Sequence, residues 1–159
     1  YVFTVGDEMI NIRPQCIYFY PSGKIRSITL WPGDQITVNT PKGPVATKLG
    51  IEIYEDKRIR SIEPSFGTIF KTEYGDAKPF MVRKHMLHSE DASARFDEDG
   101  NLLSFTTLQT RVEADGKIYK AGDYRSPLII YLGKGSVGLR GANDLNVWFD
   151  TQHTEVRFS

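Results

Sequence analysis

The sequence predicts an all-β protein, a repetitive antiparallel meander of β-hairpins that forms an elongated roll or two packed sheets. Its composition favours strands, because 14 Ile, 12 Thr, 9 Val and 19 aromatic residues outweigh 10 Leu, 7 Ala and 3 Met. The 14 Gly and 8 Pro are scattered singly along the chain, as turn residues are. Three segments of the chain also resemble one another, which is typical of a protein built from repeats.

Length and charge indicate one globular domain over residues 1–159. A chain of this length can bury a core without disulfides. Its 20 basic and 20 acidic residues cancel, so no charge bias favours nucleic acid or an anionic membrane as a partner. The longest apolar run, Leu128–Leu132, has the length of a strand and not of a membrane span. The single cysteine, Cys16, favours a reducing compartment, and we therefore expect a cytoplasmic location.

The similar segments begin at Ile17, Ile51 and Ala94. Each has an alternating apolar stretch, a turn rich in Pro, Ser, Asp or Gly, and a second apolar stretch, which predicts a β-hairpin. The segments define repeat units near residues 16–49, 50–92 and 93–125, with partial units at both ends of the chain. The matching positions are Phe19, Ile53 and Phe96; Ile25, Ile59 and Leu102; and Ser27, Ser61 and Ser104.

Two details of these hairpins can be predicted. Gly23 and Gly100 suit a turn with positive φ, whereas Lys57 at the equivalent place suits it less, so the second turn is expected to be looser or of another type. Beyond each turn the apolar residues change face, as Ile25 and Ile28 do. A β-bulge or sharp bend near the repeated serine explains the change, and burial of both faces of the strand is the alternative.

Further strands are expected around the hairpins. A strand that runs into a glycine turn follows each hairpin, over residues 38–45, 70–75 and 112–118. Val2–Val5 is predicted as an opening strand, and Val147–Phe149 and Val156–Phe158 as closing strands. Residues 76–93 interrupt the pattern and are predicted to form an excursion loop.

The stretch from Phe19 to Ser27 resembles the variant MORN repeat, a short bacterial hairpin unit with a Tyr-x-x-Gly-Lys-hydrophobic core. Residues 96–104 resemble a second copy, in which Asp97 replaces the tyrosine, and residues 53–61 a third, which lacks the glycine. The resemblance covers about nine residues per copy. It implies a sheet that serves as a binding or scaffolding surface, and it supplies no catalytic residue.

Two histidines in the excursion loop are the candidate metal site. His85 and His88 are three residues apart, and on a helix they could share a metal ion, with Glu90 and Asp91 following. The spacing lacks the Glu of the usual zinc protease motif, so a solvated loop is the competing interpretation. A loop outside the repeats is where a site is expected, because connecting segments commonly carry function.

Two other motifs are better explained as turns. Gly133–Gly138 has the spacing G-x-G-x-x-G but is not followed by the helix that dinucleotide binding needs, so a hairpin turn is predicted. Asp97–Asn101 is rich in acids, as calcium loops are, but its glycine is in the wrong place for an EF-hand, and a hairpin turn is predicted here too.

These observations predict a non-catalytic binding or scaffolding β-repeat module without a cofactor. Its partner is expected to be a protein or a small ligand, and open sheet edges could join copies of the chain. The alternative is a metal-dependent enzyme or a carbohydrate-binding protein with a site near His85 and His88.

Overall fold

In the part of the chain that the computed structural model describes, all the regular secondary structure is β-strand, which confirms the predicted fold class. The structure describes residues 1–82 and 92–159. Its strands are β1 (Val2–Val5), β2 (Glu8–Asn11), β3 (Pro14–Phe19), β4 (Ile25–Leu30), β5 (Gln35–Thr40), β6 (Gly43–Ile53), β7 (Ile59–Pro64), β8 (Phe70–Thr72), β9 (Gly75–Ala77), β10 (Ala94–Phe96), β11 (Leu102–Thr107), β12 (Val112–Ala114), β13 (Lys117–Tyr119), β14 (Leu128–Gly133), β15 (Ser136–Arg140), β16 (Asn146–Asp150) and β17 (Val156–Phe158).

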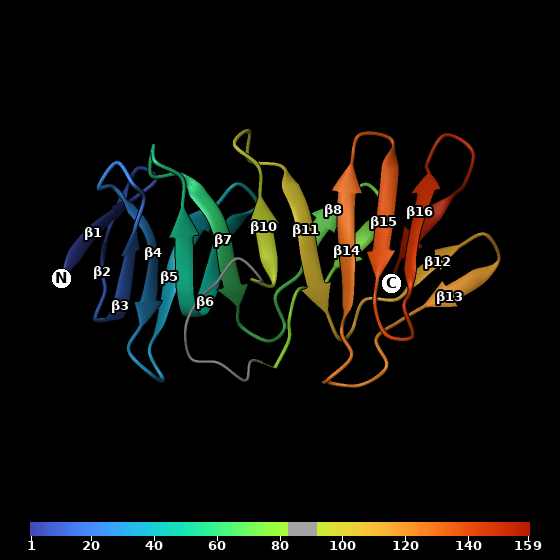
Figure 1. The fold of residues 1–159 in the computed structure, drawn as a ribbon, viewed down its shortest axis with the longest axis horizontal. Coiled ribbons are helices and arrows are strands. Elements are labelled where there is room, and N and C mark those ends of the chain that lie inside the picture. Colours follow the sequence, from blue (N-terminus) through green and yellow to red (C-terminus); the bar gives the residue numbers. More distant parts are fainter. Residues whose placement is uncertain (83–91) are drawn as a thin grey trace.

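One long antiparallel sheet forms the front layer of the molecule (Figure 1). Its strands follow the order β16-β15-β14-β11-β10-β7-β6-β4-β3, and β5 pairs with β6 alone. The strands run across the long axis of the molecule, so the sheet grows from the N-terminal end to the C-terminal end (Figure 1). The hairpins β3–β4, β6–β7, β10–β11 and β14–β15 turn at the same long edge of this sheet.

A second layer packs behind the long sheet. Its sheet has the order β13-β12-β17-β9-β8, and β1 pairs with β2 at the N-terminal end. Aromatic pairs join the layers, since Phe70 of β8 contacts Phe96 of β10 with ring centroids 5.9 Å apart. Phe105 of β11 and Phe158 of β17 lie 5.8 Å apart in the same way. The core therefore lies between two packed sheets.

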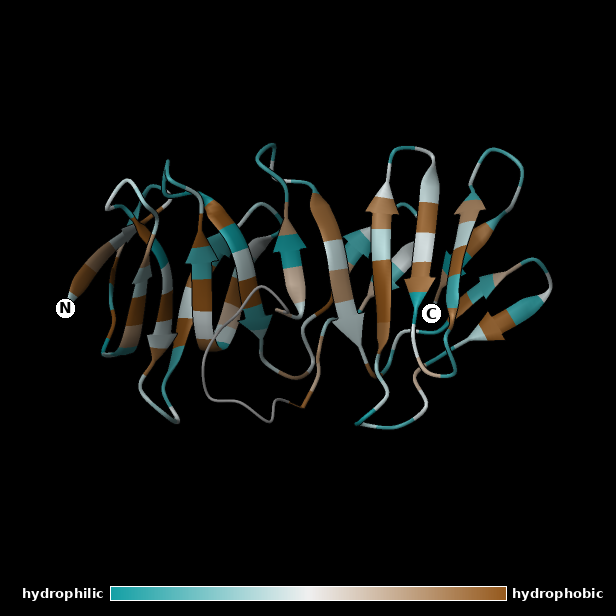
Figure 2. Cartoon of the chain, in the orientation of Figure 1, coloured by the Kyte–Doolittle hydropathy of each residue, from teal (hydrophilic) through white to brown (hydrophobic). Residues whose placement is uncertain are grey.

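The register of the long sheet sorts its side chains into rows that cross the strands. Hydrophobic residues alternate with polar ones along the strands, as Figure 2 shows, which places alternate residues on opposite faces. One row faces the core: Ile17, Ile28, Ile51, Ile62, Ala94, Phe105, Ile130, Leu139 and Val147. The neighbouring row, called here the outer row, faces away from it: Tyr18, Ser27, Glu52, Ser61, Arg95, Ser104, Tyr131, Gly138 and Trp148.

The three predicted hairpins share one register. The repeated serine pairs with Tyr18, Glu52 or Arg95, and the pairing then shifts by one residue before the turn. The extra residues at this shift are Arg26, Arg60 and Leu103. The predicted bulge beside the serine is thus confirmed. The extra residue shifts the alternation by one position, so the apolar residues on both sides of the bulge, such as Ile59 and Ile62, lie on the same face of the strand.

The expectation for the second turn is wrong. The backbone amide of Tyr54 donates to the carbonyl of Arg58 at 2.8 Å, and that of Lys57 to the carbonyl of Tyr54 at 2.8 Å. The turns that begin at Tyr20 and at Asp97 have the same two hydrogen bonds. Lys57 adopts φ 73°, close to the values of Gly23 and Gly100. These hydrogen bonds impose on a lysine the conformation that a glycine would adopt without strain.

Replacing Lys57 with glycine should therefore stabilise the protein. A left-handed conformation costs a residue other than glycine about 1–2 kcal/mol, and the substitution removes this cost. Part of the gain is lost, because glycine also has more conformational freedom in the unfolded chain. We expect Lys57→Gly to raise the free energy of unfolding by about 0.5–1 kcal/mol in urea denaturation. Lys24→Gly, one residue beyond the positive-φ position of the first turn, is the control and should not stabilise.

The strands expected after each hairpin are present, each as one arm of a second hairpin. The turns have positive φ at Gly43, Gly75 and Gly116. In the first two, a threonine hydroxyl three residues earlier donates to the glycine carbonyl at 2.7 Å. The predicted opening strand is β1, and the closing strands lie in β16 and β17.

The C-terminal strand β17 joins the last two of these hairpins, β8–β9 and β12–β13, into one sheet, whereas the β5–β6 hairpin belongs to the long sheet. It lies between β12 and β9, and its pairing with β9 is parallel. The loop predicted over residues 76–93 is wrong at its start, because Asp76 and Ala77 belong to β9. These two residues pair with β8 and so complete the hairpin that begins at Phe70.

Candidate functional site

The predicted metal ligands His85 and His88 lie outside the described residues, so this site stays a prediction. Within residues 1–82 and 92–159, no group of three His, Cys, Asp or Glu side chains could hold a metal ion. No helix in these ranges could cross a bilayer.

The two motifs predicted as turns are turns. Gly133 pairs with Ser136 at the end of the β14–β15 hairpin, and Gly135 has φ 67°. Asp97 accepts hydrogen bonds from the backbone amides of Asp99 and Asn101, each at 2.9 Å. Burial opposes ionisation of Asp97, but these hydrogen bonds outweigh it and lower the pKa of the carboxyl. The carboxylate therefore caps the turn.

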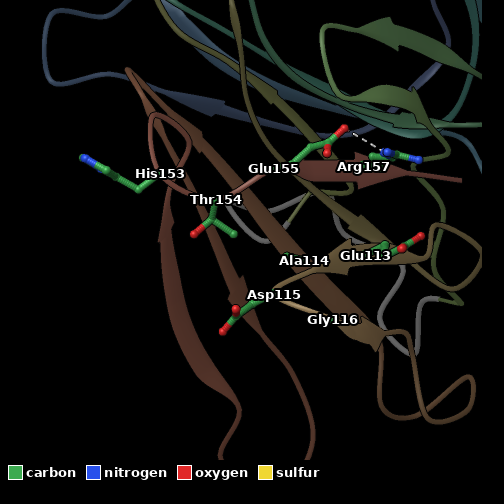
Figure 3. Close-up of a pocket in the computed structure, with 8 residues that line it drawn as sticks. All are labelled: Glu113, Ala114, Asp115, Gly116, His153, Thr154, Glu155 and Arg157. Atoms are coloured by element: carbon green, nitrogen blue, oxygen red, sulfur yellow. Dashed lines mark hydrogen bonds and ion pairs between the residues drawn. The ribbon is translucent and has the colours of Figure 1, made fainter.

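A hollow of about 300 Å³ lies beside β12 and β17. Figure 3 shows the residues that line it. Asp115 and His153 point to different sides of the hollow, whereas Glu155 and Arg157 point toward one another. His153 contacts Asp150 at 2.8 Å, and Arg157 pairs with Glu155 at 2.9 Å. Its charged side chains either point to different sides or already have partners, so few of them are available to bind one ligand.

A second hollow, of about 410 Å³, lies between the turns of the first three hairpins. Its arginines are already paired, since Arg58 contacts Asp56 at 2.6 Å and Arg60 contacts Glu52 at 3.4 Å. The hydroxyl of Tyr54 donates to the carbonyl of Phe96 at 2.6 Å, and burial raises the pKa of this hydroxyl. These contacts join successive hairpins and give the region a structural role.

The outer row ends in an exposed aromatic surface on β14, β15 and β16. Tyr131 and Trp148 have ring centroids 5.9 Å apart at an angle of 30°. Between them is Gly138, and a Cβ atom at this glycine would lie 2.7 Å from three atoms of the Trp148 ring. The indole therefore lies flat on the backbone of β15, and Trp148 remains 56% exposed. We call Tyr131, Gly138 and Trp148 the aromatic platform.

The aromatic platform adjoins a hollow of about 660 Å³, within the usual size range of ligand pockets. Ile129, Arg140 and Asn146 form its floor together with Tyr131, because they occupy the next outward-facing positions of β14, β15 and β16. The chain segment 125–127 forms one wall, and the turn between β15 and β16 forms another. We call this hollow the β14–β16 groove.

Unpaired positive charge distinguishes the β14–β16 groove from the two hollows described above. Arg125 and Arg140 both line it, and neither forms an ion pair with any carboxylate in the described residues. Arg125 is held by its neighbour Tyr124, because its Nε donates to the tyrosine hydroxyl at 2.8 Å and its guanidinium lies 5.1 Å from the ring centroid. Asp144 is the acidic residue in the lining.

Sequence reasoning missed the aromatic platform. Tyr131, Gly138 and Trp148 are far from any motif, and the sheet register alone brings them together. One signal was present, because a glycine inside an alternating strand pattern indicates a close approach by another group. Gly138 was instead assigned to the G-x-G-x-x-G spacing.

No protein-family model, curated protein or solved structure matches this chain. The resemblance to the variant MORN repeat therefore stays a prediction, and the site is interpreted from its own geometry.

Proposed function

We propose that this protein is a non-catalytic binding module that binds sugar rings at the aromatic platform and in the β14–β16 groove. The observation that carries the proposal is the position of Trp148, which lies flat on Gly138, stacks with Tyr131 and is more than half exposed. The exposed face of this indole is apolar surface that no other described residue covers, and polar groups lie next to it. An exposed apolar surface of this kind commonly marks a binding site.

Carbohydrates fit this combination. The faces of a pyranose ring carry C–H groups that pack on aromatic rings, and its hydroxyls need polar partners around the edge. Arg140 and Asn146 supply donors and an acceptor on the floor of the groove, and Ser126 supplies a hydroxyl at its wall. Groups of this kind orient a ligand, which supports binding as the role of the groove.

The repeated hairpins are the proposed scaffold for this surface. Three hairpins with one register and one bulge position support the interpretation as repeat units, and variant MORN-like sheets are regarded as binding surfaces. In the described part of the long sheet, β3, β5 and β16 each pair with one strand alone and so have an open edge. Pairing of copies through these edges and a cytoplasmic location stay predictions.

Replacing Trp148 tests the proposal, and Trp31 is the matched control. Both tryptophans are about half exposed. Trp31 lines a separate hollow of about 520 Å³, and the guanidinium of Arg13 lies 5.2 Å from its ring centroid. In electrophoresis gels that contain neutral or acidic polysaccharides, we expect at least one polysaccharide to slow the wild-type protein. Trp148→Ala should weaken this binding about 30-fold, as loss of an aromatic hot spot does.

Trp31→Ala should keep the wild-type affinity. Both variants should be checked for folding by circular dichroism. The proposal is wrong if no polysaccharide slows the folded wild-type protein, or if the two tryptophan variants lose binding equally.

A further inference from the structure

We infer that the sugar ligand is acidic: the β14–β16 groove takes a polysaccharide whose rings carry carboxylate or sulfate groups, and Arg140 and Arg125 bind those groups. The inference rests on the proposed function and specifies its ligand. It follows from the placement of charges next to the aromatic platform.

Arg140 occupies the central position of the groove floor. It lies on β15 between Ile129 of β14 and Asn146 of β16 in one cross-strand row. The aromatic platform forms the adjacent outward-facing row, two residues along each strand, which is about 7 Å away. A sugar ring stacked on the platform therefore has its edge substituents within reach of the Arg140 guanidinium.

Arg125 faces the same groove from its wall, where Tyr124 holds the side chain. Guanidinium groups bind carboxylates and sulfates through two parallel hydrogen bonds, and such charge-assisted bonds are stronger than neutral ones. Other arginines of the long sheet do have acidic partners, as Arg26 and Arg60 have in Glu52. Two arginines against one acid, Asp144, leave the groove with a net positive charge.

A third arginine extends this charge along the outer row. Arg95 lies on β10, two strands from Tyr131. It pairs with Ser104 of β11, which in turn pairs with Tyr131 of β14. It forms no ion pair with a carboxylate among the described residues. The row from Trp148 to Arg95 crosses five strands and is about 19 Å long at the usual strand spacing.

A polysaccharide fits better than a nucleic acid, although bases also stack on aromatic rings. The protein has no net charge, whereas binding to a phosphate backbone usually relies on an extended basic surface. Single-stranded RNA is therefore the competing ligand that the experiment must include.

Titration calorimetry with four polymers tests the inference. The first pair is polygalacturonate and fully methyl-esterified polygalacturonate, which differ only in whether the carboxyl groups are charged. Dextran sulfate replaces carboxylate by sulfate, and poly(U) represents RNA. We expect the wild-type protein to bind polygalacturonate or dextran sulfate at least 10-fold more tightly than the methyl ester, and the preferred acid identifies the source of the charge.

Arg140→Gln should weaken binding of the preferred acidic polymer about 10- to 100-fold, because one charge-assisted contact is lost. Its binding of the methyl ester should change less than threefold. The control is Arg111→Gln, which makes the same change in net charge at an exposed position beside β12 of the second layer. This variant should bind as the wild type does.

The outcomes separate the two proposals. Equal binding of charged and esterified polymer, unaffected by Arg140→Gln but lost in Trp148→Ala, overturns the acidic ligand and keeps the sugar-binding function. Tightest binding to poly(U), lost in both variants, overturns both in favour of RNA. Absence of binding to all four polymers overturns the acidic ligand, and the sugar-binding function then depends on the gel test with neutral polysaccharides. An equal effect of Arg111→Gln and Arg140→Gln shows nonspecific charge attraction and overturns the inference.

Discussion

Gly75→Ala is expected to lower the free energy of unfolding by about 3–5 kcal/mol, which corresponds to a fall in Tm of roughly 10 °C. A Cβ atom at Gly75 would lie 2.3 Å from the carbonyl oxygen of Phe158. That oxygen is backbone and cannot turn aside, so β17 must move away from β9. The movement exposes Phe158, which packs against Phe105 of the long sheet, and burying such a side chain contributes about 2–3 kcal/mol.

Gly43→Ala is the matched control. Gly43 ends the equivalent hairpin turn, with φ 100° against 126° at Gly75, and nothing lies within 4 Å of a Cβ atom placed there. It should show only the conformational penalty of about 1–2 kcal/mol. Urea denaturation measures both variants. Equal losses in the two would contradict the position of β17 between the second hairpins.

Glu52→Ala is expected to cost about 3 kcal/mol. The carboxylate is 2% exposed and lies between two guanidiniums, with Arg26 Nε 3.3 Å from one oxygen and Arg60 Nε 3.4 Å from the other. Removing it leaves two positive charges side by side against a poorly solvated surface. Loss of one partner of a buried pair usually costs 3–5 kcal/mol, and the partial exposure of these arginines places the effect at the lower end.

The control for this variant is Glu155→Ala, which removes a carboxylate from an exposed pair with Arg157 and should change stability by less than 0.5 kcal/mol. A double-mutant cycle between Glu52 and Arg60 should show a coupling of at least 1 kcal/mol. Additive effects of the two substitutions would contradict an ion pair between Glu52 and Arg60 that stabilises the fold.

The sequence predicted the local parts of this fold well. A hairpin depends on turn residues and alternation within about a dozen positions, so the first hairpins and their bulges could be found from single segments. The change in alternation between Ile25 and Ile28 predicted a bulge or bend near Ser27, and the structure has the bulge at Arg26. Lys57 shows the limit of such reasoning, because the hydrogen bonds of the turn override its preference for negative φ.

The binding surface could not be predicted in the same way. Alternation places Trp148 on the opposite face from Val147, but it does not reveal which residues lie beside it. That depends on the registers of β14, β15 and β16, which bring Tyr131 and Gly138 to the same row. The burial of Glu52 likewise depends on arginines from two other strands.

The two tryptophans offer the most direct test of the central claim, which is that sugars bind at the aromatic platform. Trp31 and Trp148 are the tryptophans of the chain, so a ¹⁵N-labelled sample gives one indole N–H signal from each, and Trp31→Phe assigns them. Titration with the polysaccharide that slows the protein most in gels should shift or broaden the Trp148 signal in proportion to saturation and leave the Trp31 signal in place. A saturating titration that moves the Trp31 signal alone, or neither signal, would contradict the account.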